Sequence, residues 1–224
     1  MENKKTYTLN LECVKTGYAN GIAPGFPFTE KEKWSMVDEA AEAYGKFLDA
    51  LQCDWRNDPN SADTPRRVAK AYVFDLWKGR YESMSDITSF PSDGYQGIVL
   101  EKDIPLISQC SHHHQTIMGV VHIAYIPGPE GNVVGLSKLN RIVDHFGRRG
   151  AIQEQLTMAI HNAIDKICEG NVGVMVMVKA THNCVSCRGV KHQGASMMTS
   201  EVSGVFADHT KTAKMEVLEM IKMG

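Results

Sequence analysis

The sequence lacks a long hydrophobic run. Its longest apolar stretch, residues 172–178, is far shorter than the ~20 residues that a membrane-spanning helix needs. The first residues, Met-Glu-Asn-Lys-Lys-Thr, contain no apolar core of the kind that a signal peptide has. We therefore expect a cytoplasmic protein that does not contact a membrane.

The sequence also lacks an excess of charge of either sign. Its 24 Lys and Arg residues nearly balance its 26 Asp and Glu residues, which gives a formal net charge of −2. This balance argues against a global basic field that would collect nucleic acid. Internal repeats, low-complexity segments and a glycine-rich Rossmann motif are missing as well. Any anion must therefore bind to a local group of basic residues.

The N-terminal residues predict an extended arm that leads into a helix. Residues 1–28 contain several glycines and prolines without periodicity, which is typical of an arm or a loop. Thr29 and Glu32 match a capping box, in which the two side chains bond to the first backbone amides of a helix. Apolar residues follow at spacings of three and four as far as Leu51, which predicts one amphipathic helix.

A second helix is predicted after a polar break. Thr64 suits its cap, Pro65 suits the first helical position, and an apolar face continues to Gly79. Its other face carries three basic side chains, Arg66, Arg67 and Lys70. Taken alone, such a face is typical of a solvated surface. We therefore expect an N-terminal helical region over residues 29–80.

The remaining residues, 81–224, predict a second domain of mixed strands and helices. It begins with a turn-rich connection as far as residue 96. The predicted strands cover residues 98–100, 104–107, 117–126, 172–178 and 197–206. The predicted helices cover residues 137–146, 151–168 and 210–223. Because strands and helices do not alternate one by one, the pattern favours an α+β fold with a largely antiparallel sheet.

Two runs of cysteine and histidine residues stand at the ends of predicted strands. The first is Cys-Ser-His-His-His, which begins at Cys110, and the second is His-Asn-Cys-Val-Ser-Cys, which ends at Cys187. Zinc binds thiolates and imidazoles, and a catalytic zinc keeps three protein ligands and one open position. Cys110, His113 and Cys184 would make such a set.

A closed structural zinc site is the competing interpretation. Cys184 and Cys187 form a Cys-x-x-Cys half-site, which Cys110 and a histidine would complete. Three further histidines lie beside these ligands, namely His112, His114 and His182. They favour the open site, since imidazole titrates near neutral pH and can transfer protons. A disulfide framework is the weaker interpretation of the six cysteines, because the sequence shows no sign of export.

Basic residues gather around the start of a predicted helix. Ser137 and Lys138 follow Gly135 there, Arg141 lies one turn on, and Arg188 comes just after the second Cys/His run. Backbone amides at a helix N-terminus, an ammonium and two guanidinium groups suit a polyphosphate.

Two neighbouring residues, Gln153 and Glu154, suggest a base-binding position. A carboxylate at Glu154 could accept two parallel hydrogen bonds, from N1–H and from the exocyclic amine of guanine. Taken alone, a glutamate in this place is more often a solvated helix residue.

Taken together and in order, the motifs resemble the GTP cyclohydrolase I family. They are Ala-Asp-Thr-Pro-Arg-Arg-Val-Ala-Lys, Cys-x-His-His, His-Ile-Ala-Tyr-Ile-Pro, Gly-Leu-Ser-Lys-x-x-Arg-Ile-Val-Asp, Gln-Glu-x-Leu-Thr and His-x-Cys-x-x-x-Arg-Gly-Val. The match runs from about Thr29 to the end of the chain, and the order of several motifs is far more specific than any one of them. The resemblance implies a tunnelling fold, an antiparallel sheet with helices on one face, as the catalytic domain over residues 81–224. It also implies a toroidal homodecamer with its sites at subunit interfaces.

The resemblance further implies a reaction and a role for each residue. Enzymes of this family convert GTP to 7,8-dihydroneopterin triphosphate and formate with Zn²⁺. Cys110, His113 and Cys184 match the zinc ligands, which selects the open site. The residues that match proton transfer are His112, His182 and Ser137, with His182 protonating N7 of the purine and His112 assisting the opening of the ribose. The residues that match substrate contacts are Gln153, Glu154, Lys138, Arg141, Arg188 and Lys70.

The chain departs from the family pattern at three places. Ser111 stands where the family usually has Glu, Gln155 stands where it usually has Arg, and residues 114–117 replace a more typical Phe-x-Pro-Phe. Two alternatives follow. The first is an enzyme that stops at the ring-opened formamide or prefers another guanine nucleotide, and the second is a zinc-stabilised nucleotide-binding protein without turnover. The related nitrile reductase needs a catalytic thiol and NADPH, which a Cys/His metal set fits poorly.

Overall fold

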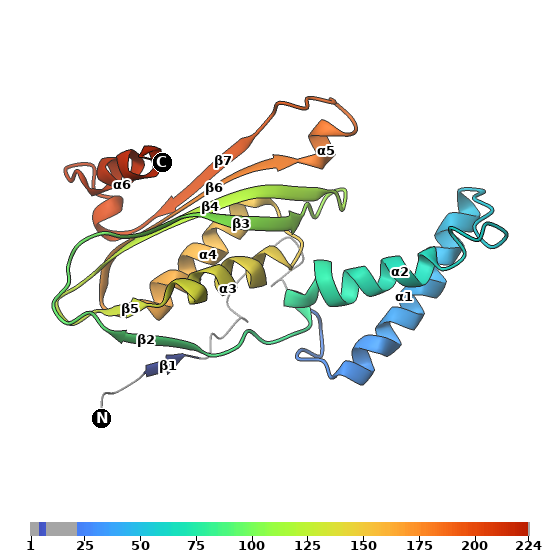
Figure 1. Ribbon diagram of the computed structural model, residues 1–224, viewed down its shortest axis with the longest axis horizontal. Coiled ribbons are helices and arrows are strands. Elements are labelled where there is room, and N and C mark those ends of the chain that lie inside the picture. The colour runs from blue at the N-terminus through green and yellow to red at the C-terminus, as the bar shows by residue number, and fades with distance from the viewer. Residues whose placement is uncertain (1–4, 8–21, 224) are drawn as a thin grey trace.

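A four-stranded antiparallel sheet lies at the centre of the structure (Figure 1). The computed structural model describes residues 5–7 and 22–223, so most of the predicted arm over residues 1–28 lies outside the described residues. The strand order in the sheet is β3–β4–β6–β7. The strands are β3 (Val99–Gln109), β4 (Thr116–Pro127), β6 (Asn171–His182) and β7 (Met197–Val202). This sheet and its helices confirm the predicted α+β class.

The register of the sheet brings the two Cys/His runs to the same edge. β3 and β4 form a hairpin in which Gln109 pairs with Thr116, so the loop that begins at Cys110 connects their ends. β4 and β6 pair with Ile117 opposite His182. The end of β6 therefore lies beside the hairpin loop, and the short helix α5 (Asn183–Ser186) continues from it.

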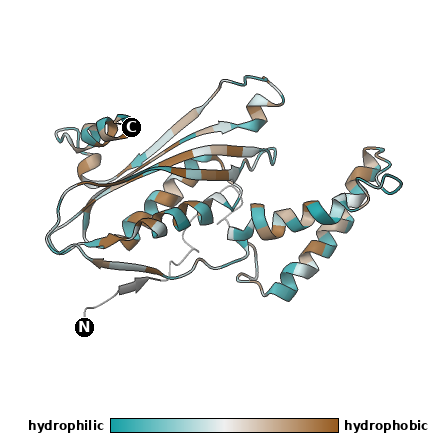
Figure 2. Cartoon of the chain, viewed as in Figure 1, coloured by the Kyte–Doolittle hydropathy of each residue, from teal (hydrophilic) through white to brown (hydrophobic). Residues whose placement is uncertain are grey.

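Two helices cover one face of the sheet. α3 (Leu136–Gly147) packs on β3, and α4 (Gln153–Ile167) packs on β6 and β7. Side chains such as Ile123, Val176 and Ile160 are completely buried between these layers. Figure 2 shows apolar residues along both helices and the central strands. Because full burial of one such side chain contributes about 1.5–3 kcal/mol, this layer supplies a large stable core beneath the Cys/His edge.

The last helix, α6 (Ala213–Lys222), lies on the opposite face of the sheet (Figure 1). Its Val217 packs with Ala124 and Met175 of the sheet. The predicted strand over residues 197–206 ends early, because Gly204 turns the chain with a φ of 54° into the 3₁₀-helix η4 (Gly204–Phe206). No helix among the described residues is long and apolar enough to cross a membrane.

A second sheet, which has three strands, lies near α3 and α4 (Figure 1). Its strand β2 (Ile87–Pro91) pairs with β1 (Lys5–Tyr7) on one side and with β5 (Asn132–Val134) on the other. The prediction of a turn-rich connection over residues 80–96 is therefore wrong at β2. The apolar alternation of this strand is very short, and its partners lie far away in the sequence, so the local pattern carries almost no signal.

Two helices at the N-terminus, α1 (Glu30–Ala50) and α2 (Thr64–Ala71), lie side by side next to the sheet (Figure 1). The predicted capping box is present: the Glu32 amide donates to Thr29 Oγ1, and the Thr29 amide donates to a Glu32 carboxylate oxygen at 2.7 Å. The second helix starts at Thr64, one residue earlier than predicted, so the cap position belongs to Asp63 and not to Thr64.

The second helix does not run to Gly79 as predicted. It changes at residue 72 into the π-helix η2 (Tyr72–Leu76), which is followed by the 3₁₀-helix η3 (Lys78–Arg80). Tertiary contacts hold the chain at Gly79, within η3. The Gly79 amide donates to the Arg148 carbonyl at 3.0 Å, and Arg149 Nε donates to the Gly79 carbonyl at 3.1 Å. A side chain at Gly79 would lie 2.2 Å from a backbone oxygen of α3, so only glycine fits here.

Candidate metal centre and catalytic site

Three side chains at the Cys/His edge of the sheet converge on one point. Cys110 follows β3, His113 lies in the hairpin loop, and Cys184 lies in α5. Their ligand atoms all lie within 4.8 Å of one another. Cys110 is buried, Cys184 is partly buried and His113 is exposed, so the group is open on one side. This arrangement suits a metal ion that has three protein ligands and one free coordination position.

The chemistry of these donors also fits a metal cation. Burial, together with the neighbouring Cys110 thiol, raises the pKa of Cys184. Two thiolates at this separation repel each other unless a positive charge lies between them. A divalent metal ion supplies that charge and binds both sulfur atoms in their deprotonated form.

Cys187 has other partners. Its thiol lies 2.7 Å from the Asn183 carbonyl oxygen and 3.6 Å from Gln115 Oε1, to which it can donate. Among the described residues, the convergent group of ligands contains Cys110, His113 and Cys184 without Cys187. The closed Cys-x-x-Cys site is therefore not the arrangement that the described residues adopt.

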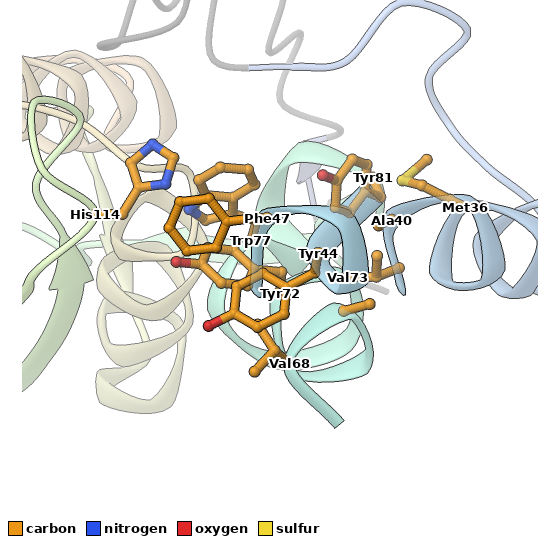
Figure 3. Close-up of a pocket in the computed structure, with 11 residues that line it drawn as sticks. Met36, Ala40, Tyr44, Phe47, Val68, Tyr72, Val73, Trp77, Tyr81 and His114 are labelled. Atoms are coloured by element: carbon orange, nitrogen blue, oxygen red, sulfur yellow. The ribbon is translucent and has the colours of Figure 1, made fainter. Parts of the chain in front are cut away.

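The histidines of the hairpin loop face different surroundings. His112 is exposed next to His113, with the two ring centroids 6.4 Å apart. His114 turns away through a left-handed backbone conformation, with a φ of 52°. Its ring packs edge-on against Trp77, with the two ring centroids 5.0 Å apart. The same ring lines an aromatic cavity of about 390 Å³ beside α1 and α2 (Figure 3). The structure therefore leaves His112 beside the metal ligands and directs His114 toward the N-terminal helices.

His182 is the second histidine that the structure keeps near the metal ligands. It ends β6 two residues before Cys184 and is half-buried. Burial lowers the pKa of His182, and the nearby Glu154 carboxylate opposes that effect. Its Nε2 lies 2.7 Å from Gln153 Oε1.

The start of α4 is attached directly to the strand end that carries Cys110. The Ala151 amide donates to the Gln109 carbonyl at 3.0 Å, and the Ser111 amide donates to the Ala151 carbonyl at 3.3 Å. These bonds bring Glu154, whose side chain is exposed in the first turn of α4, to the metal edge. The Glu154 carboxylate is thus exposed and close enough to His182 to affect its pKa.

Gln153 differs from its neighbour because its side chain points inward. It is 1% exposed, and its Nε2 lies 3.2 Å from the Val178 and Met197 carbonyl oxygens and 3.1 Å from Thr199 Oγ1. Sequence reasoning expected a substrate contact at this residue and missed the hydroxyl group of Thr199. The sequence carries no signal for either, since the bonds join α4 to strands that follow later in the chain.

The basic residues of α3 lie at the other end of the sheet. α3 runs along β3: Asn140 donates to Glu101 near the start of the strand, whereas Gly147 packs on Ile107 near its end. Ser137, Lys138 and Arg141 share the first turns of this helix. From Arg141 to Gly147 the helix rises ~9 Å and from Ser137 it rises ~15 Å, and the strand covers ~10 Å more from Ile107 to Cys110, so these residues lie roughly 19–25 Å from Cys110 along the two elements. One chain therefore does not bring these residues to its own metal ligands.

The other two predicted basic residues have different positions. Arg188 follows α5, and its Nη1 lies 3.5 Å from the carbonyl oxygen of Cys184, so it belongs to the metal edge. Lys70 lies on the exposed face of α2, with its Nζ 5.7 Å from the ring centroid of Trp34. Within one chain, Lys70 is part of the N-terminal helices rather than of the metal edge.

Comparison with known proteins agrees with this geometry. Residues 40–222 match the family model of GTP cyclohydrolase I. GTP cyclohydrolase 1 of Bacillus mycoides (strain KBAB4) is 42% identical over 170 residues, which are 74% of this chain and 88% of the relative. The protein of the same name from Bacillus anthracis (strain CDC 684 / NRRL 3495) has the same identity and coverage.

Among solved structures, an archaeosine synthase, QueF-Like in the apo form, shares 20% identity with a TM-score of 0.39 and covers 48% of this chain and 93% of its own. That likeness is too distant to bear on function. The family match covers most of the chain and includes both Cys/His runs. The chain therefore belongs to the GTP cyclohydrolase I family.

Proposed function

We propose that this protein is a Zn²⁺-dependent GTP cyclohydrolase I, which converts GTP to 7,8-dihydroneopterin triphosphate and formate. The observation that carries the proposal is the convergence of Cys110, His113 and Cys184 on one open position. His182 ends β6 two residues before Cys184, and the Glu154 carboxylate is close enough to His182 to raise its pKa against the effect of burial. A nucleotide base at this edge would meet a carboxylate, an imidazole and a metal site together.

Cys110, His113 and Cys184 would hold the zinc ion. Two thiolates and one imidazole form a soft donor set that suits zinc, and three protein ligands leave room for one more. When bound, zinc supplies an activated water for attack on C8 of the purine.

The chain's own residues then orient the base and move protons. Glu154 would accept hydrogen bonds from N1–H and from the exocyclic amine of guanine, which selects guanine over adenine. His182 would deliver a proton to N7 as the imidazole ring of the purine opens. His112, which is exposed beside the metal ligands, would assist the later opening of the ribose.

The triphosphate would be bound by a neighbouring subunit. Ser137, Lys138 and Arg141 lie too far from the metal edge of their own chain, so a second copy must present them to it. Ser137 could also carry protons in the late steps. Two outer strands, β3 and β7, bound the four-stranded sheet, and such strand edges can pair with further copies. We therefore propose a homo-oligomer, which by family resemblance is a homodecamer, with Lys70 and Arg188 completing the triphosphate contacts.

Incubation of the zinc-loaded protein with GTP tests the proposed reaction. We expect one formate per GTP consumed and a pterin that fluoresces after oxidation. A ring-opened formamide without pterin would support the first alternative, an enzyme that stops early. Faster turnover of a deoxyguanosine triphosphate would indicate a different preferred nucleotide. GTP binding without formate would identify a binding protein and contradict the proposal.

A complementation experiment tests the shared site. His182→Ala should inactivate the metal half, and Lys138→Ala with Arg141→Ala should weaken the basic half. In mixed oligomers from equal amounts of both proteins, about a quarter of the sites would combine two intact halves and recover activity. A mixture of His182→Ala and Cys184→Ala proteins is the control, because both changes damage the same half. Equal recovery in both mixtures would contradict the shared site.

A further inference from the structure

Gln153 sits inside a closed set of hydrogen bonds that orders its side chain. Thr157 Oγ1 donates to the Gln153 backbone carbonyl at 2.8 Å. Because that bond uses the only hydroxyl hydrogen of Thr157, the 2.6 Å contact between Thr157 and Thr199 must be donated by Thr199. The hydroxyl oxygen of Thr199 is then left to accept from Gln153 Nε2 at 3.1 Å.

Backbone carbonyls determine the same orientation independently. The carbonyl oxygens of Val178 and Met197 both lie 3.2 Å from Gln153 Nε2. Carbonyl oxygens can only accept, so the NH₂ group of the amide must face them and the amide oxygen must face the other way. Two separate sets of neighbours therefore agree that Gln153 Oε1 points at His182.

The orientation of Gln153 has a consequence for His182. An amide oxygen can only accept, so the 2.7 Å contact with His182 Nε2 requires a hydrogen on that nitrogen. His182 therefore has its hydrogen on Nε2 whenever its ring is neutral, and Nδ1 is the nitrogen left to exchange a proton with another molecule.

We propose that Gln153 is a positioning residue that holds the ring and the tautomer of His182, and that its side chain does not bind the guanine base. This proposal rests on the proposed function in so far as His182 acts on the substrate. It separates two neighbours in the sequence: Glu154 is exposed and free to bind a base, whereas Gln153 is 1% exposed and turned toward the protein.

The kinetic test compares Gln153→Ala with Glu154→Ala in the zinc-loaded enzyme. A positioning residue acts on the rate, so Gln153→Ala should lower kcat by about 100-fold, near the low end of what a misplaced proton donor costs. Its equilibrium affinity for GTP should stay within about threefold of the parent enzyme, because the base contact is intact. Glu154→Ala should instead weaken GTP binding. A tenfold or larger loss of GTP affinity in Gln153→Ala with kcat retained would overturn the proposal.

Two further measurements keep the test decisive. Gln153→Glu retains the shape of the side chain but replaces the donor NH₂ by an oxygen that faces two carbonyls, so it should lose activity as Gln153→Ala does. Zinc content should be unchanged in both variants, which separates loss of positioning from loss of the fold. Full activity in Gln153→Glu would contradict the orientation assigned here.

A spectroscopic measurement is independent of turnover. Solid-state NMR of the zinc-loaded protein with ¹⁵N-labelled histidine, assigned by comparison with His182→Ala, reports which ring nitrogen carries the hydrogen. We expect the Nε2–H form in the parent protein and a mixture of tautomers in Gln153→Ala. An Nδ1–H form in the parent protein would overturn the proposal. Because this signal needs no reaction, it remains valid if the protein fails to release formate from GTP.

Discussion

The two halves of the proposed site differ in how much of each a single chain completes. At the metal edge, three ligands, two histidines and Glu154 come together through strand pairing and the attachment of α4. At the start of α3, Ser137 and Arg141 are exposed on the surface. Arg141 Nη1 donates a long hydrogen bond of 3.4 Å to Ser85 Oγ. The comparison teaches that one chain by itself brings together the residues proposed for the chemistry, whereas Ser137 and Arg141, which are proposed for the triphosphate half, lie exposed on its surface.

Removing a metal ligand should have the largest effect, because it removes the metal from the half of the site that one chain completes. Cys184→Ala leaves two ligands, so zinc should be lost and formate release should fall by more than ~100-fold, since changes that merely touch a ligand's neighbours already cost 10–100-fold. Metal analysis together with the formate assay measures this. Cys187→Ala is the matched control and should keep both zinc and activity. Equal loss of zinc in the two variants would show that Cys187 is also a ligand, as the closed Cys-x-x-Cys interpretation requires.

Removing His182 should separate two properties of the metal edge, proton transfer and metal binding. His182→Ala should retain zinc and bind GTP, yet release formate ~10²–10⁴-fold more slowly, which is the usual contribution of a positioned acid. Product analysis should find unreacted GTP in this variant. In His112→Ala we expect the ring-opened formamide or its deformylated product to accumulate instead. If His182→Ala converted GTP at the rate of the parent enzyme, His182 would have no part in the mechanism.

Changing the base contact should have an intermediate effect. Glu154→Gln replaces one acceptor by a donor that faces a donor of guanine, at a cost of about 1–3 kcal/mol, or roughly 5- to 150-fold in affinity. Calorimetric titration with GTP measures the change, and zinc content should not change. Gln155→Ala, one residue further along α4, is the control and should bind GTP as the parent does. Unchanged affinity in Glu154→Gln would remove the guanine contact from the metal edge.

The smallest effect is expected in the basic half. Lys138→Ala removes one phosphate contact from several, which should raise KM by roughly fivefold, or about 1 kcal/mol, with kcat little changed. Because the lost interaction is between charges near the surface, the difference from the parent enzyme should shrink as salt is added. A fall in kcat at constant KM would show that Lys138 takes part in the chemistry, and would contradict the division into two halves.

The local features of the fold could be predicted from the sequence because short-range bonds create them. The capping box at Thr29 involves residues three positions apart, and the helices and central strands follow from periodic burial. A metal site was also predictable from the two Cys/His runs, but the residues alone left open whether Cys187 joins it, and the family resemblance selected Cys110, His113 and Cys184, which converge in the structure. β2 was not predictable, because its strand partners are distant in the sequence. The 3₁₀-helix at Gly79 was not predictable either, because Gly79 packs on α3, which follows much later in the chain.

The sequence by itself determined which residues can bind a metal, move a proton or contact a phosphate, because those properties belong to the side chains. Only the tertiary structure decided where they act. It turned Gln153 inward to His182 and sent His114 to the aromatic cavity beside α1. It also put the basic start of α3 at the far end of β3 from Cys110. Each of these outcomes depends on contacts between elements that are distant in the chain, and no local pattern encodes the direction in which a side chain points once those elements have packed.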